Sequence, residues 1–348
     1  MSARPRPPAQ QAVRLRDVAQ AAGVHPATAS RALNAATRSQ VNAETSRRVL
    51  RAAESLGYQP NPIARSLKTS RSYTVGLVLP DLTNPFFPPV VRGIESGLEA
   101  AGYDAWIVDT RNDPERERSR IESLRSRQVE GLVIATARIE HPYLAELHEK
   151  GVVMVLVNRR TSGLDLPCVL PEDGPGIAMA VDHLAALGHT RIAHLAGPDD
   201  TSTGVARSRA FRHAVRDQGL PDDPELVATC TEWSEDAGAA ALRGLLDDGV
   251  RFTAVVAAND LIALGCYDVF AERGIDCPAD ISVVGFNDMP FLTKLRPPLT
   301  TVHVPHHEIG AEAARMLLEY IAEPDRTPRT LLLPVTLLER ESTAPPRS

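Results

Sequence analysis

The stretch Leu15–Asn34, LRDVAQAAGVHPATASRALN, contains two runs of apolar residues at helical spacing, separated by a single glycine. Gly23 suits the left-handed position that ends a helix, and Pro26 suits the first turn of the next helix. Two short helices joined by a tight turn are therefore predicted, which is the pattern of a helix-turn-helix. Because such hairpins also occur in many helical bundles, the pattern alone favours DNA binding only modestly.

Charge is divided unequally along the chain. Residues 1–70 contain eleven Lys and Arg against three Asp and Glu, a net charge of +8. Since the whole chain carries −6, the remainder carries −14. A basic head on an acidic body favours a polyanionic partner for the head, because cations that neutralise phosphates release counterions. A merely soluble basic tail would explain the charge, but not its position on an ordered helical unit.

Length and composition indicate a protein of several domains without a membrane partner. The chain has 348 residues, of which 43% are hydrophobic. No apolar run reaches membrane-spanning length, and the first residues, MSARPRPPAQQ, lack the apolar core of a secretory signal, so a cytoplasmic location is expected. The four cysteines, Cys168, Cys230, Cys266 and Cys277, lack CxxC spacing, and we expect ordinary thiols with no metal and no cofactor.

From Tyr73 onward the sequence alternates between short apolar runs and segments with helical periodicity. A third helix of the head, about 43–56, precedes this region and stops at Gly57. The apolar runs are 74–80, 104–110, 131–136, 152–158, 191–197, 225–230, 254–260 and 281–286. This alternation predicts parallel sheets covered by helices on both faces, and the number of strands indicates two doubly wound subdomains. Ligands of such sheets bind at the carboxyl ends of the strands.

The chain resembles the lac repressor (LacI) family of bacterial transcription regulators over nearly its whole length. The resemblance begins with LRDVAQAAGVHPATASRALN and continues through residues 44–87, ETSRRVLRAAESLGYQPNPIARSLKTSRSYTVGLVLPDLTNPFF. It recurs in HLAALGHTRIAHLAG, AANDLIALG, ISVVGFND, PPLTTV and LLERESTAPP. The resemblance implies a small helical DNA head, a hinge helix, a core like the periplasmic sugar-binding proteins, and a homodimer.

The domain boundaries follow from this resemblance. We expect a leader over 1–12, the helix-turn-helix domain over 13–60, and the hinge helix and linker over 61–72. The effector-binding and dimerisation core is expected over 73–343. Its N-subdomain is placed at about 73–170 and 299–323, and its C-subdomain at about 171–298 and 324–343.

The resemblance also assigns residues to the DNA interface. Arg31 is the strongest candidate reader, since its guanidinium can bond both acceptors of a guanine, whereas Ala27 offers only apolar contact to a thymine methyl. Thr28, Ser30 and Asn34 suit phosphate contacts. The expected contacts on the second helix are His25, Pro26, Ala27, Thr28, Ser30, Arg31 and Asn34, and those on the hinge helix are Ala64, Leu67 and Lys68. Leu67 from each subunit is expected to wedge between the central base pairs in the minor groove.

Two positions depart from the family pattern. His25 stands where a small hydroxyl residue is usual, and Arg14 stands where the family often has a Ser or Thr cap. Because both changes remove an oxygen that would accept from the first backbone donors, each helix start is expected to weaken by about 1 kcal/mol.

An effector site is expected where polar and aromatic residues follow the strands of the core. Aromatic faces stack on sugar rings while amides, a carboxylate and a guanidinium bond their hydroxyls. The candidates are Asp81, Asn84, Phe86, Phe87, Asn158, Arg207, Trp233, Asn259 and Asn287. Each has a plainer reading, since the phenylalanines could be core, the asparagines could cap helices, and Arg207 could pair with a surface acid. Asn287 replaces a frequent Asp, which leaves the ligand's charge open.

The function predicted is that of a regulator, most simply a repressor, that binds a palindromic operator and is controlled by a small polar effector such as a sugar. A purine-responsive, corepressed regulator is an alternative. A solute-binding protein would need a signal peptide and no basic head. An enzyme is not expected, because the chain lacks GxGxxG, GxxxxGK[ST] and GxSxG motifs.

Overall fold

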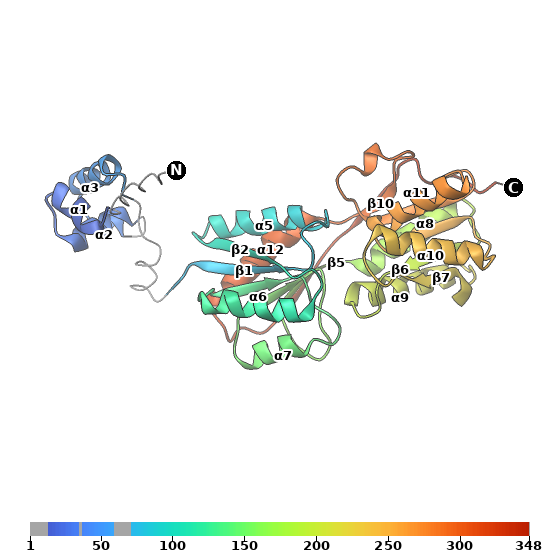
Figure 1. Cartoon of the computed structure of the whole chain (residues 1–348), viewed down its shortest axis with the longest axis horizontal. Helices are drawn as coiled ribbons and strands as arrows, with labels where there is room; N and C mark the ends of the chain where they lie inside the picture. Colours follow the sequence, from blue (N-terminus) through green and yellow to red (C-terminus); the bar gives the residue numbers. More distant parts are fainter. Residues whose placement is uncertain (1–12, 35–36, 59–70, 348) are drawn as a thin grey trace, which may run out of the picture. The chain divides into compact units, whose positions relative to one another are not determined.

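The chain divides into two units, residues 1–72 and 73–348, and the described part of the first unit contains three α-helices (Figure 1). The computed structural model describes residues 13–34, 37–58 and 71–347. The helices of the head are α1 (Leu15–Ala21), α2 (Pro26–Leu33) and α3 (Ala43–Ser55), with a short 3₁₀ turn at Arg38–Gln40. Gly23 has the predicted left-handed conformation, with φ of 62°. The helix-turn-helix predicted from the sequence is thus present.

Small side chains bring the three helices of the head together. The buried set consists of Val18, Ala19, Ala22, Ala29, Ala32, Val49 and Ala53. Two arginines fasten the ends of the helices. Arg48 Nε of α3 donates to the Ala22 carbonyl at 2.8 Å, and Arg38 Nε donates to the Ala32 carbonyl at 3.0 Å. The position of Arg48 on its helix predicts an outward-facing cation, but Arg48 also stabilises the packing of the head through its hydrogen bond to the Ala22 carbonyl.

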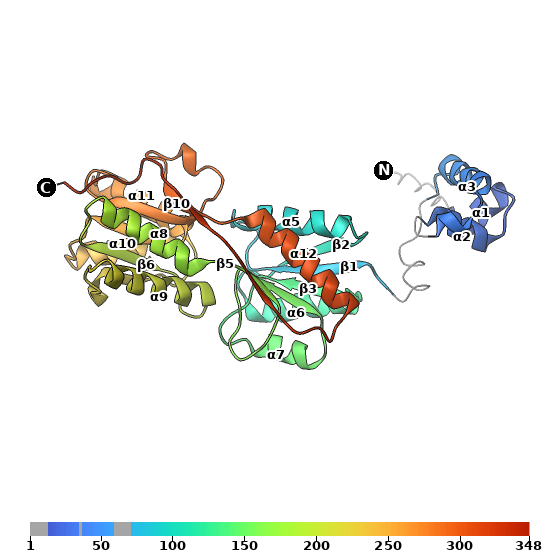
Figure 2. The ribbon, with the colours of Figure 1, turned by 180° about the vertical axis from the view of Figure 1, so that it is seen from behind.

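Two six-stranded sheets form the second unit (Figures 1 and 2). The first has the order β11-β5-β4-β3-β1-β2 and the second β12-β10-β9-β8-β6-β7. Every neighbouring pair is parallel except β10 and β12. The strands are β1 (Thr74–Leu79), β2 (Asp104–Asp109), β3 (Gly131–Ile134), β4 (Met154–Val157), β5 (Cys168–Pro171), β6 (Ile192–Ala196), β7 (Val227–Thr229), β8 (Ala254–Ala257), β9 (Ser282–Asn287), β10 (Thr300–His303), β11 (Thr330–Leu333) and β12 (Thr336–Leu338).

Helices cover both faces of each sheet, as the alternation of the sequence predicts. We call the first sheet and its helices α5, α6, α7 and α12 the first lobe, and the second sheet with α8 to α11 the second lobe. In the first lobe, side chains of alternate residues along the strands pack on α5 and α12 or on α6 and α7. The helices are α5 (Phe87–Glu99), α6 (Pro114–Ser126), α7 (Pro142–Glu149), α8 (Asp173–Ala186), α9 (Ser202–Asp217), α10 (Glu235–Asp247), α11 (Asp260–Arg273) and α12 (His306–Ala322). None of the described helices is both long and apolar enough to cross a membrane.

The chain passes between the lobes three times, after β5, after β10 and after β11 (Figure 2). This corrects the expected subdomain boundaries. Strand β10 falls in the segment 299–323 assigned to the first lobe but pairs with β9 of the second. Strand β11 falls in the segment 324–343 assigned to the second lobe but pairs with β5 of the first. Hydrogen-bond partners decide to which sheet a strand belongs, and chain order near the crossings does not reveal those partners.

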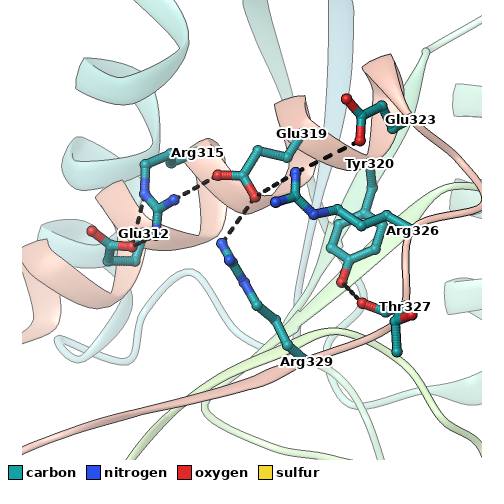
Figure 3. Close-up of polar contacts among 8 residues, drawn as sticks. All are labelled: Glu312, Arg315, Glu319, Tyr320, Glu323, Arg326, Thr327 and Arg329. Carbon is teal, nitrogen blue, oxygen red and sulfur yellow. Dashed lines mark hydrogen bonds and ion pairs between the residues drawn. The ribbon is translucent and has the colours of Figure 1, made fainter.

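An arginine cluster fastens the return from α12 to β11 (Figure 3). The Glu319 carboxylate on α12 accepts from Arg315 at 2.6 Å and Arg329 at 2.9 Å, and lies 3.3 Å from Arg326. Tyr320 Oη donates to the Thr327 carbonyl at 2.8 Å. These contacts hold the connection that leads into the outer strand of the first sheet.

Glycines allow one pair of helices in each lobe to approach closely. A methyl group on Gly93 of α5 would overlap the His307 carbonyl of α12, and one on Gly310 of α12 would overlap the Val90 carbonyl of α5. In the second lobe, a methyl on Gly265 of α11 would overlap the Glu235 carbonyl of α10. These helices therefore touch backbone to backbone, and no larger residue fits at the crossing.

Replacement of Gly93 by Ala should destabilise the protein by about 1–3 kcal/mol, because the added methyl forces α5 away from α12. Urea denaturation followed by circular dichroism measures the change. Gly244 on α10 is a matched control, since nothing lies near the methyl that it would gain and it is exposed. Gly244→Ala should stabilise by about 0.5–1 kcal/mol. Equal stabilities for Gly93→Ala and the parent would contradict the close crossing.

His194 makes stability depend on pH. Its ring is buried on β6, stacks on Phe211 with centroids 4.6 Å apart, and bonds the Val256 carbonyl through Nδ1 at 2.8 Å. Burial, aided by the nearby Arg207 and Arg212, lowers the pKa of His194 to about 4. In the unfolded chain a histidine pKa is about 6.5. Below that pH the unfolded chain binds a proton that the folded protein excludes, so stability is lost as the pH falls from 6.5 towards 4.

The loss attributable to His194 should reach up to about 3 kcal/mol at pH 4. Urea titrations of the parent protein and His194→Gln at pH 7.5 and pH 5 measure it. The variant should lose less stability between the two pH values than the parent. Other groups, such as Asp260, whose pKa burial raises to about 6, titrate in both proteins and cancel in the comparison. An identical pH dependence in the two proteins would refute the role of His194.

Candidate DNA interface and ligand cavity

Helix α2 presents a short polar surface on the head. Ala27 and Arg31 are exposed, while Ala29 and Ala32 on the opposite side are buried against the other helices. Of the other predicted contacts, His25 and Asn34 are exposed, and Pro26, Thr28 and Ser30 are half-buried. The seven predicted DNA-contacting residues on this helix therefore all reach the surface of the head, with Arg31 the cation on its outer side.

The expected loss of the cap at the start of α2 is wrong. His25 Nδ1 accepts from the Ala27 N–H at 3.2 Å, so an imidazole nitrogen takes the place of a hydroxyl oxygen. At the start of α1, the Asp17 carboxylate accepts from the Arg14 N–H at 2.8 Å. The predicted hinge residues Ala64, Leu67 and Lys68 lie outside the described residues.

A narrow cavity lies between the two lobes of the second unit. Side chains that follow β1, β4, β7, β8 and β9, together with two on α9, form its wall. Because the carboxyl ends of parallel strands share one edge of a sheet, residues far apart in sequence meet here. The lining is Asn84, Phe86, Phe87, Asn158, Arg159, Thr203, Arg207, Trp233, Asn259 and Asn287.

Several polar atoms of this wall are enclosed without a hydrogen-bond partner among the described residues. They are Asn158 Oδ1, Arg159 Nε, Trp233 Nε1 and Asn287 Oδ1. Buried polar atoms are normally satisfied, and an exception calls for an unseen ligand, ion or water. Asn158 and Asn287 also have positive φ angles of 63° and 123°. Strained backbone of this kind gathers at ligand sites.

Arg207 is the structural centre of the wall. Its Nε donates to the Asp173 carboxylate at 2.7 Å, and its Nη1 donates to the Ala258 carbonyl at 2.6 Å. The guanidinium lies 3.8 Å from the centre of the Phe286 ring and 5.7 Å from that of Trp233. Burial raises the pKa of Asp173, and the attraction of Arg207 opposes that rise. Arg207 is therefore paired with Asp173, whose side chain is only 12% exposed, and not with a surface acid.

Two other candidates, Asn84 and Asn259, combine a structural hydrogen bond with their place in the lining. Asn84 Oδ1 accepts from the Phe86 N–H at 3.0 Å, and Asn259 Oδ1 accepts from the Ile262 N–H at 2.8 Å as the cap of α11. The Trp233 ring lies against Gly197, where an added methyl would overlap it. Phe86 and Phe87 meet edge to face with centroids 5.1 Å apart.

The structure places Asp81 outside the cavity lining. Its carboxylate closes a local turn, accepting from the Thr83 N–H at 2.8 Å and from the Thr83 hydroxyl at 2.7 Å. Arg159 and Thr203 line the cavity but were not singled out in the sequence. Arg159 stands in the run NRR, which resembles an exposed basic segment, and Thr203 lies in the first turn of a helix. Adjacency to Asn158 is the one sequence signal that could have marked Arg159.

Backbone and side-chain bonds also cross directly between the lobes. Arg138, from the loop after β3, lies 3.3 Å from the Asp200 carboxylate of the second lobe. The neighbouring Ile139 N–H donates to the Asp200 carbonyl at 2.9 Å. These contacts close one side of the interlobe cleft.

Among the described residues, no cluster of three or more His, Cys, Asp or Glu side chains is arranged to hold a metal ion. The cysteines are free, and burial raises the pKa of Cys230 and Cys277 to about 12. Both thiols are protonated at neutral pH.

Family models match both units of the chain. The model described as bacterial regulatory proteins, lacI family, matches residues 14–61, and that of the periplasmic binding protein-like domain matches residues 181–343. A helix-turn-helix unit followed by a two-lobed core of parallel sheets defines a class of DNA-binding transcription regulators.

Individual proteins resemble the chain over almost its whole length. An uncharacterized HTH-type transcriptional regulator in the aml 5′ region of Streptomyces limosus is 37% identical over 338 residues, covering 95% of this chain and 94% of that protein. The lac repressor dimer bound to operator and the anti-inducer ONPF has a TM-score of 0.84 at 28% identity, covering 96% and 100% of the two chains. The complex of the transcriptional regulator CelR with cellobiose has a TM-score of 0.73 at 32% identity, covering 95% and 99%.

The chain therefore belongs to the lacI family of bacterial regulatory proteins. It is a DNA-binding transcriptional regulator and not an enzyme.

The prediction that Arg31 reads a guanine is tested by replacing Arg31 with Ala. The loss of a bidentate contact costs about 1–3 kcal/mol, so the variant should lose its preference at the base pair that Arg31 contacts. Fluorescence anisotropy with a selected DNA site and its single-base variants measures the preference. Arg51 on α3 is also exposed and serves as the control. Arg51→Ala should leave the order of preference among the variants unchanged. An Arg31→Ala protein that still discriminates at every position would exclude Arg31 as a base reader.

Proposed function

We propose that this regulator is a repressor that binds a palindromic operator as a homodimer and that responds to a small sugar-like effector held between the lobes. The observation that carries the proposal is the set of enclosed, unpartnered polar atoms facing the interlobe cavity of a chain whose head exposes a cationic helix. The unpartnered polar atoms of the cavity support binding of a ligand, and the exposed cationic helix of the head supports binding of DNA.

The outer strand β2 supports the proposal of a homodimer. It forms one edge of the first sheet, and its Trp106 and Ile107 are 40% and 39% exposed, although both are large and apolar. An uncovered edge strand with apolar side chains is a natural surface for association. Such an association would present two heads to the two halves of a symmetric site.

The composition of the cavity wall supports a sugar-like effector. Trp233, Phe86 and Phe87 supply aromatic surface, while the asparagines and arginines supply hydrogen-bonding groups. Aromatic rings pack on the C–H faces of sugars, and amides bond their hydroxyls. We therefore propose as effector contacts the residues that line the cavity: Asn84, Phe86, Phe87, Asn158, Arg159, Thr203, Arg207, Trp233, Asn259 and Asn287.

The three passages between the lobes and the cross-cleft bonds of Asp200 support control by closure. A ligand that touches both lobes favours the state in which they are close. If the closed and open dimers hold their heads differently, the ligand changes operator affinity. A difference of about 1–3 kcal/mol in ligand affinity between the two states changes operator affinity by roughly 5–150-fold.

Operator titrations test the proposed function. Genomic fragments that bind the full-length protein are selected, the site is footprinted, and the mass of the free protein is measured by sedimentation. We expect a symmetric footprint, a dimeric mass and a salt-dependent affinity. Sugars and purines are then added to the complex, and one sugar should change the affinity at least about fivefold. A monomeric mass or an asymmetric footprint would refute the dimer, and a response to purines alone would refute the sugar-like effector.

A further inference from the structure

Positive charge dominates the wall of the interlobe cavity. The lining contains Arg159 and Arg207 but no aspartate or glutamate. Arg207 is already balanced by the buried Asp173 carboxylate, 2.7 Å away, which is not part of the lining. Arg159 therefore carries the unbalanced charge of the cavity.

Arg159 has no ion-pair partner in the described part of the chain. Its side chain is only 8% exposed, and its Nε is enclosed without a hydrogen bond. The one carboxylate whose field acts on it is that of Asp200, which already pairs with Arg138 and is 52% exposed. Burial lowers the pKa of Arg159 to about 10, so the guanidinium keeps its charge at neutral pH. Burying a charge without a partner is costly, and the cost is recovered when an anion binds.

The other unpartnered atoms define the neutral part of the ligand. Asn158 Oδ1 and Asn287 Oδ1 are acceptors, and only a ligand that carries donors, such as hydroxyl groups, satisfies both. Trp233 Nε1 is a donor, and its ring lies 6.0 Å from the Arg159 guanidinium. One small molecule that carries both hydroxyl donors and an anionic group satisfies all of these atoms at once.

We propose that the effector is a small hydroxylated anion, a sugar acid or a sugar phosphate, whose negative group pairs with Arg159. The proposal rests on the proposed function, in that the cavity is taken to be the effector site, and adds the charge of the ligand.

Matched series of ligands test the charge. Glucose, glucuronate and glucose 6-phosphate, with the corresponding galactose compounds, are titrated into the full-length protein by calorimetry. Inorganic phosphate and acetate serve as anions without a ring. In the series that binds, a charged member should bind about tenfold or more tightly than the neutral sugar, because bonds between a guanidinium and an anion are the stronger ones. The carboxylate and phosphate members of each series distinguish the two sources of charge.

The proposal is overturned if the neutral sugar binds as tightly as its anions, if inorganic phosphate alone binds as tightly as the sugar phosphate, or if none of the compounds binds. These failures leave the proposed function standing wherever a neutral sugar still shifts the operator titration. Conversely, loss of the symmetric footprint refutes the proposed function without bearing on the charge of the ligand.

Variants of Arg159 separate a ligand-binding role from a structural one. Arg159→Met removes the charge but keeps the length, and should raise the thermal midpoint of the ligand-free protein while the anion loses its tenfold advantage. Arg159→Lys should retain part of that advantage. Arg160→Met, at the exposed neighbouring position, should change neither quantity. A lower midpoint for ligand-free Arg159→Met, or an unchanged preference for the anion, would overturn the proposal.

Discussion

The shared direction of the strands is the constraint from which the rest of the core follows. All but one of the strand pairs are parallel, and the strands β1, β4, β8 and β9 all lead into residues of one interlobe cavity. Right-handed crossovers place the helices on the faces of the sheets and leave the strand ends free of covering helices. Several of the cavity side chains, such as Asn84, Asn158 and Trp233, therefore belong to short connections, whose sequence can vary without disturbing the sheets. Thr203 and Arg207 reach the cavity from helix α9.

Much of this architecture could be predicted from the sequence, because its signals are local. Gly23 and Pro26 mark the turn of the head, and eight apolar runs became β1 to β4 and β6 to β9. The sequence does not predict the strands β5, β10, β11 and β12, which lie beside the crossings between the lobes. What decides their place is pairing with a distant strand, which no local pattern encodes.

The candidate site was predictable to the extent that strand ends were predictable. Asn158 and Asn259 lie at the ends of the apolar runs 152–158 and 254–260, Asn287 directly follows the run 281–286, and all three line the cavity. Asp81 also follows a strand, but its carboxylate is consumed by the turn at Thr83. Arg159 lines the cavity although the sequence does not predict it there. A run of basic residues normally indicates a solvent-exposed segment, and only the packed structure reveals that Arg159 is buried. Burial of a charge is a tertiary property, so the ligand's charge could not be inferred earlier.

The three passages of the chain between the lobes mean that neither lobe is a continuous piece of sequence. The outer strand β11 of the first sheet and the outer strand β12 of the second both lie after α12, within the last twenty residues or so of the chain. A premature stop following α12 would strip a strand from each sheet at once. A single cut in the gene therefore cannot separate the two lobes and leave both sheets complete.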